Sequence, residues 1–141
     1  MKAMMPAGGH LLIGAALMTV LMLTGCSGPA NQEVDGVIAV VGREPTGLQE
    51  LAQGELTTTR GGCLALEADG RTFLLVWPPD VEIATESGRT TVIVPKADES
   101  LTLGGPVIIG GGLLSADAVQ TFSIPAGCVG FDGVYLVNGL D

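Results

Sequence analysis

The segment that decides the fold is Cys63–Trp77, which reads CLALEADGRTFLLVW. Apolar residues recur at alternate positions on both sides of Asp69-Gly70, and this period of two is typical of β-strands. An Asp-Gly pair between two such runs favours a type I′ hairpin turn, which places Leu66 opposite Phe73. We expect one face of the hairpin to lie in the core, and that face carries Leu64, Leu66, Phe73, Leu75 and Trp77.

The other face of this hairpin is also mostly apolar, with Leu74 and Val76 among its residues. Two apolar faces are typical of strands that lie inside a sheet and not at its edge. Pro78-Pro79 follows directly, and neither proline can donate a hydrogen bond to a neighbouring strand. The hairpin is therefore predicted to be central and to end at Trp77.

Short β-branched runs separated by Gly and Pro continue through the rest of the chain, and no long helical period interrupts them. This pattern predicts an all-β fold, a small barrel or sandwich of about 7–8 short strands. Thr46–Gln53 and Ser115–Gln120 are each compatible with one or two helical turns. The predicted strands are Gly36–Val41, Glu55–Arg60, Cys63–Glu67, Arg71–Trp77, Thr90–Pro95, Pro106–Ile109, Val119–Ile124 and Gly133–Val137.

The region before the first predicted strand divides into a leader and a linker. Lys2 precedes the apolar stretch Leu11–Leu23, whose 13 residues are too few for a spanning helix and suit the hydrophobic region of a secretion signal. Ser27–Asp35 is polar, with Gly and Pro, and buries too little apolar surface to fold alone. We therefore expect a signal peptide at 1–25, a flexible tether at 26–35 and a single β-domain at 36–141.

The end of the leader reads Leu23-Thr24-Gly25-Cys26, which resembles the lipobox of bacterial lipoproteins. This resemblance implies cleavage before Cys26 and attachment of a diacylglycerol to its sulfur. The protein would then be held at a membrane, facing the outside of the cytoplasm, because two acyl chains anchor stably. The alternatives are an ordinary cleaved signal peptide or an uncleaved short anchor.

Cys63 and Cys128 are the two remaining cysteines once Cys26 is assigned to lipid. An oxidising compartment and an even count favour one disulfide between them. Free thiols or a redox pair are the alternatives, although the chain lacks a Cys-x-x-Cys spacing and a neighbouring His or Lys that would lower a thiol pKa.

The charge and composition of the mature chain restrict its partners. Without the leader, the chain has five basic and fifteen acidic residues, which gives a formal charge of −10. Nucleic acid is therefore not expected as a partner, because phosphates require a basic surface. The leader also contains His10, the only histidine, and every methionine. No cofactor or metal is expected, since neither an imidazole nor a spare thiolate remains as a soft ligand.

Catalysis by the usual nucleophiles is not expected either. A mature chain without histidine cannot use a Ser-His or Cys-His pair. Lys96 with Ser100 or Ser87 is conceivable as a Ser-Lys pair, but Lys96 lies in the polar stretch PKADES, which reads as a loop. Gly110–Gly112 lacks the residues of a phosphate loop and is predicted to be a turn or bulge.

The carboxylates leave a hydrolase open as an alternative. Glycosidases use two carboxyl groups about 5–10 Å apart, and the pairs to examine are Asp80 with Glu82 and Glu67 with Asp132. The case is weak because few aromatic residues remain to bind a sugar.

The mature part also loosely resembles small uncharacterised lipoproteins of high-GC Gram-positive bacteria. The shared features are GCLAL at 62–66, Trp77-Pro78-Pro79, the triple glycine and IPAGC at 124–128. We therefore expect a non-catalytic lipoprotein that binds an unknown envelope protein or ligand, or that supports the envelope. A carrier of an apolar ligand is a further alternative, and it requires a cavity lined by Leu75, Trp77 and Phe122.

Overall fold

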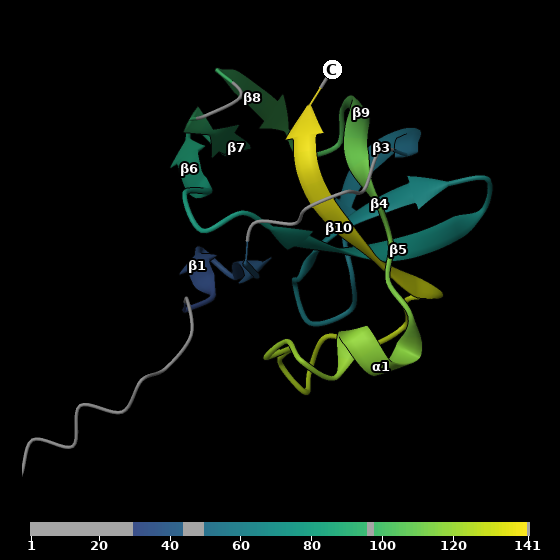
Figure 1. The fold of residues 1–141 in the computed structure, drawn as a ribbon. Helices are drawn as coiled ribbons and strands as arrows, with labels where there is room; N and C mark the ends of the chain where they lie inside the picture. Colours follow the sequence, from purple (N-terminus) through teal and green to yellow (C-terminus); the bar gives the residue numbers. More distant parts are fainter. Residues whose placement is uncertain (1–29, 44–49, 96–97, 141) are drawn as a thin grey trace, which may run out of the picture.

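The computed structural model describes residues 30–43, 50–95 and 98–140, and the elements within them are almost all strands (Figure 1). The predicted all-β class with one disulfide is therefore confirmed. The elements are β1 Gln32–Val34, β2 Val37–Val41, β3 Glu50–Thr58, β4 Leu64–Ala68, β5 Arg71–Trp77, β6 Glu82–Glu86, β7 Arg89–Val94, β8 Glu99–Thr102, β9 Pro106–Leu113, α1 Ala116–Val119 and β10 Gly133–Leu140.

Five strands close into a barrel in the order β3-β4-β5-β10-β9, because β9 pairs with β3 again. All neighbours are antiparallel except β5 and β10, which are parallel. Counted along the chain, the barrel strands follow the order first, second, third, fifth, fourth. This is the strand order of the OB-fold, a five-stranded Greek-key barrel.

The β4–β5 hairpin has the predicted register. Leu66 lies opposite Phe73, and both Asp69 (φ 53°) and Gly70 (φ 74°) have the positive φ that a type I′ turn requires. The hairpin is also central as predicted, since β3 flanks β4 and β10 flanks β5. Its predicted inner face lies in the main core of the barrel.

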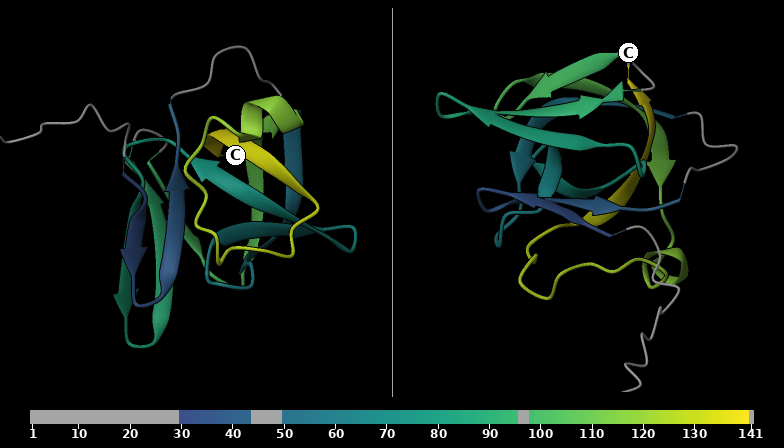
Figure 2. Two further views of the ribbon diagram at one scale, coloured as in Figure 1. Left: turned by 90° about the horizontal axis from the view of Figure 1, so that it is seen from below. Right: turned by 90° about the vertical axis from the view of Figure 1, so that its left-hand side faces the viewer.

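Two additions lie on the same side of the barrel (Figure 2). One is the β1–β2 hairpin, which joins the barrel through a short parallel pairing of Val40 and Val41 with the end of β5. The other is a separate sheet of β6, β7 and β8, whose apolar residues complete the main core. β1 falls within the expected tether, so Gln32–Val34 form a strand instead.

Two apolar clusters lie on opposite faces of β5. The main cluster fills the barrel interior, where Leu75 and Trp77 are fully buried. The second cluster lies on the outer face, around Leu74, Val76 and the disulfide. The alternation of inward and outward side chains along a strand explains why both hairpin faces are apolar.

Several predicted elements differ from the structure. Val119–Ile124 is not a strand: Val119 ends α1, and the helical alternative for Ser115–Gln120 is the one that forms. β3 starts at Glu50, so the helical turn suggested for Thr46–Gln53 is wrong for its last four residues, while its first four lie outside the described part. Gly110–Gly112 continues β9 and is not a turn, whereas the bulge alternative agrees with the register shift in β10 between Val137 and Gly139, opposite Gly111 and Gly110. β6 and β8 were not predicted.

Candidate functional site

A single segment between β9 and β10, Leu114–Asp132, lies over the outer face of the barrel, and we call it the cover segment. At its start, Leu114 N donates to Val134 O (2.9 Å). At its end, Asp132 N donates to Thr72 O (2.7 Å), and the Asp132 carboxylate accepts a hydrogen bond from Thr72 N (2.9 Å). Ser115 caps α1 inside the segment by accepting a hydrogen bond from Ala118 N.

The cover segment shields the apolar outer face of β2, β5 and β10. Leu74 and Val76 expose no surface beneath it. The residues of the cover segment that pack against this second cluster are Leu114, Val119, Phe122, Ile124 and Phe131. In OB-folds, ligands bind to the face of the second and third strands, between the loops after the first and fourth strands. Here the chain itself occupies the β5 part of that face.

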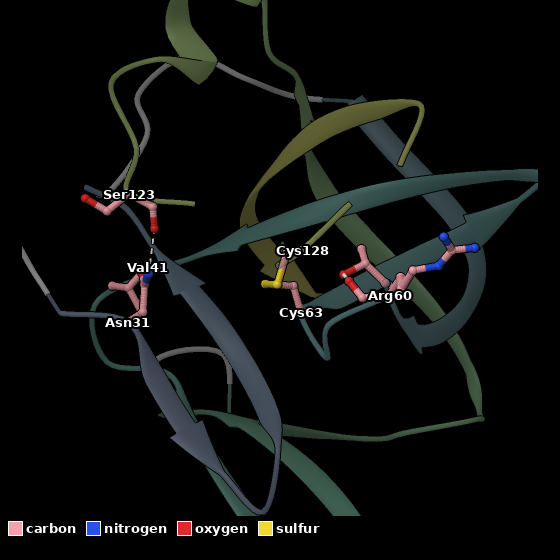
Figure 3. Close-up of a disulfide and its surroundings, with 7 residues drawn as sticks. Asn31, Val41, Arg60, Cys63, Ser123 and Cys128 are labelled. Carbon is pink, nitrogen blue, oxygen red and sulfur yellow. Dashed lines mark hydrogen bonds between the residues drawn. A yellow bond between two sulfur atoms is a disulfide. The ribbon is translucent and has the colours of Figure 1, made fainter. Parts of the chain in front are cut away.

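The disulfide Cys63–Cys128 fixes the cover segment to the loop between β3 and β4, as predicted (Figure 3). The two Cα atoms are 5.7 Å apart, and the bond links positions separated by 65 residues. Beside it, Val129 N donates to Arg60 O (3.2 Å). The two loops with which OB-folds hold ligands are thus joined covalently.

Asn31 joins the middle of the cover segment to the end of β2. Its Oδ1 accepts a hydrogen bond from Val41 N (3.0 Å), and its Nδ2 donates to Ser123 O (2.6 Å). Figure 3 shows Asn31, Val41 and Ser123 close together, on the opposite side of the disulfide from Arg60. We call this corner of the barrel, formed by Asn31, Val41–Arg43 and Ser123, the attachment end.

The residues expected to line a ligand cavity do not come together. Leu75 and Trp77 lie inside the barrel, and no part of either residue is accessible to water. Phe122 lies in the cover segment, in the second cluster on the other side of β5. No common cavity is therefore formed by these three side chains.

The four carboxylates of the proposed pairs lie on strands or in the turns and bends between them. Asp132 bonds to the backbone of β5, and Glu67 is exposed on β4, opposite Thr72. Asp80 is half-buried in the turn after β5, whereas Glu82 is exposed on β6. Across the described ranges, no three His, Cys, Asp or Glu side chains are arranged to hold a metal ion. Lys96 lies outside the described residues.

Tyr135 is the described titratable residue with a clearly shifted pKa. Its hydroxyl donates to Glu50 O (2.9 Å) from the end of the barrel interior. Burial raises the pKa of Tyr135 above its ordinary value, and the negative charge of Glu50 raises it further. The sequence indicated Tyr135 only as a core aromatic and gave no signal for Asn31, which lies in a polar stretch.

The outer face of β3 and β9 carries an apolar pair that nothing covers. Leu51 on β3 is 66% exposed and Ile108 on β9 is 37% exposed. They share this face because Leu51 lies opposite Gly110 and Ile108 lies opposite Gln53.

The comparisons with known proteins yield no relative. No family model matches the chain, and neither a curated protein nor a solved structure is significantly similar to it. Among the described residues, no helix is both long and apolar enough to span a bilayer. Cys26 and the leader lie outside these residues. The class of protein is therefore defined by its architecture alone, a five-stranded barrel with a disulfide-held cover.

Proposed function

We propose that this protein is an extracytoplasmic lipoprotein, anchored in a membrane by lipid on Cys26. Its barrel is a non-catalytic module that binds another envelope component or supports the envelope. The observation that carries the proposal is the division of the three cysteines. The one in the lipobox-like sequence stands apart, and the other two form the disulfide that joins the barrel to its cover segment.

The packing of the barrel favours binding by an outer surface over binding within the barrel. The side chains of Leu75 and Trp77 leave no room beside them for an apolar ligand. The cover segment occupies the outer face of β5, and the disulfide holds it there. Leu51 and Ile108 remain exposed on the outer face of β3 and β9, which the cover segment does not occupy.

Phase partition in the native host tests the lipid anchor. Wild-type protein is expected in the detergent phase at the size of a chain that starts at Cys26. The variant Cys26→Ser lacks the sulfur that accepts the lipid, so it should accumulate as precursor. Ser27→Ala, which alters the adjacent residue and keeps the thiol, is the matched control and should behave as wild type. Normal processing of Cys26→Ser would contradict the proposal.

A further inference from the structure

We infer that the attachment end of the barrel lies against the membrane, and that the tip of the β4–β5 hairpin points away from it. The inference rests on the proposed lipid anchor at Cys26 and adds to it a defined orientation. The lipid surface is thus the partner of one particular end of the barrel.

Only a short connection separates Cys26 from Asn31. Asn31 is held by two hydrogen bonds, one to β2 and one to the cover segment. Cys26 stands five residues before it. A fully extended chain advances at most about 3.6 Å per residue, so the Cα atoms of Cys26 and Asn31 stay within roughly 18 Å of each other.

The strand directions place the tip of the β4–β5 hairpin at the opposite end of the barrel. β2 and β5 are parallel, and both finish at the attachment end, where Gly42 N donates to Trp77 O (2.9 Å). The turn at Asp69-Gly70 lies at the start of β5, at its opposite end. Figure 1 shows β1 and the β4–β5 hairpin on opposite sides of the molecule.

The length of β5 can be compared with the reach of the connection between Cys26 and Asn31. β5 contains seven residues and spans about 20 Å at roughly 3.3 Å per residue. An inverted barrel, with the hairpin tip on the lipid, would lift Asn31 by at least this distance. The backbone between Cys26 and Asn31 reaches about 18 Å only when it is fully extended, so inversion is strongly disfavoured while Asn31 keeps its two hydrogen bonds.

The distribution of charge favours the same orientation. Glu67 lies opposite Thr72, Asp69 lies in the hairpin turn, and Asp132 accepts a hydrogen bond from Thr72 N, so three carboxylates gather around the start of β5. Anionic headgroups repel carboxylates, so this end is disfavoured at the lipid surface. The acidic residues at this far end are Glu67, Asp69 and Asp132.

Paramagnetic attenuation measures the orientation directly. The lipidated protein, isolated from its membrane and checked by mass, is placed in nanodiscs of phosphatidylcholine and phosphatidylglycerol. Some headgroups carry chelated gadolinium, which weakens the amide signals of nearby residues. The amides of Asn31, Gly42 and Ser123 should lose most of their intensity, while those of Asp69 and Gly70 keep theirs. Equal loss at both ends, or the reverse order, would overturn the orientation.

Two further results separate this inference from the lipid anchor. If the isolated protein carries no lipid and no amide is attenuated, both the anchor and the orientation are wrong. Ten Gly and Ser residues inserted between Ser27 and Gly28 should lengthen the connection and reduce the contrast between the two ends. A lipidated insertion variant with undiminished contrast would show that the short connection does not set the orientation.

Discussion

Asn31 connects three parts of the fold: the start of the β1–β2 hairpin, the end of β2 and the cover segment. Its amide group accepts a hydrogen bond from Val41 and donates one to Ser123, which lies 92 residues away in the chain. An asparagine in a polar, Gly- and Pro-containing stretch looks like any other linker residue. Sequence patterns detect periodicity and turns, and a long-range side-chain hydrogen bond produces neither.

Replacing Asn31 with Ala should destabilise the domain by about 1–2 kcal/mol, because two hydrogen bonds are lost and the amide of Val41 loses its partner. Denaturant unfolding of the soluble domain measures the free energy of unfolding. Glu33→Ala changes an exposed residue of β1, the strand that follows Asn31, and should stay within about 0.5 kcal/mol of wild type. Equal stabilities of the two variants would show that the side chain of Asn31 does not hold this end.

Gly111 explains why the triple glycine is part of a strand. Its φ is 154°, and an added Cβ atom would collide with the carbonyl group of Leu136. The sequence suggested a turn or bulge, since glycine runs usually form turns. Glycine is required at position 111 because the backbone of β10 approaches it closely, and this contact exists only in the folded structure.

Gly111→Ala should therefore cost at least about 1–3 kcal/mol of unfolding free energy, the range typical of backbone strain. Gly127→Ala is the matched control, because no atom lies within 4 Å of the added Cβ at that position. The control should change the unfolding free energy by less than about 0.5 kcal/mol. Thermal or denaturant unfolding of both variants decides the matter, and a harmless Gly111→Ala would refute the close packing.

Tyr135 makes stability depend on pH in the alkaline range. Because burial and then Glu50 raise its pKa, the folded chain keeps the phenol proton at a pH where the unfolded chain, with a pKa near 10.0, has lost it. This contribution to stability is complete below pH 10 and is lost as the pH rises through the folded pKa. Tyr135→Phe should remove this part of the pH dependence.

The titration of Tyr135 is directly observable, since the chain contains one tyrosine. Absorbance of the phenolate at alkaline pH should show a midpoint above 10.0 in the folded protein. A midpoint equal to that of the unfolded chain would contradict the burial of this hydroxyl.

At the scale of elements, local signals predicted the β4–β5 hairpin to the exact pairing of residues. Alternation, the Asp-Gly turn and the terminal prolines all agreed there. The same reasoning failed for Val119–Ile124. Its apolar residues pack against the second cluster from the end of α1 and the loop after it, and not from a strand. This reasoning also missed β6 and β8, since β6 is mostly exposed and both strands are short. Such strands form through pairing with β7, which is not a local property.

The disulfide is the element-scale feature with the largest expected effect on stability. Closing a loop of 65 residues removes about 4 kcal/mol of chain entropy from the unfolded state. A double variant, Cys63→Ala with Cys128→Ala, should lose stability of this order. Hydrogen exchange should become faster in the cover segment than in β3 and β9. A loss below about 1 kcal/mol with unchanged exchange would show that apolar packing alone retains the cover segment.

At the scale of the whole molecule, the proposed lipid-bearing Cys26 stands only five residues before Asn31, which is hydrogen-bonded to β2 and the cover segment. The sequence predicted the all-β class, the central hairpin and the disulfide. It also gave a small barrel as one of two architectures, and the barrel is the one that forms, but it did not predict which strands close the barrel or the separate β6–β8 sheet. Closure depends on the pairing of β3 with β9, which lie far apart in the chain, and no local pattern specifies such a partner.

The mass of the intact protein, purified from the membranes of its native host, tests the central claim most directly. Our account predicts a polypeptide that begins at Cys26, keeps the Cys63–Cys128 disulfide and carries the added mass of a diacylglyceryl group. A full-length chain, or a shortened chain free of fatty acids, would contradict it.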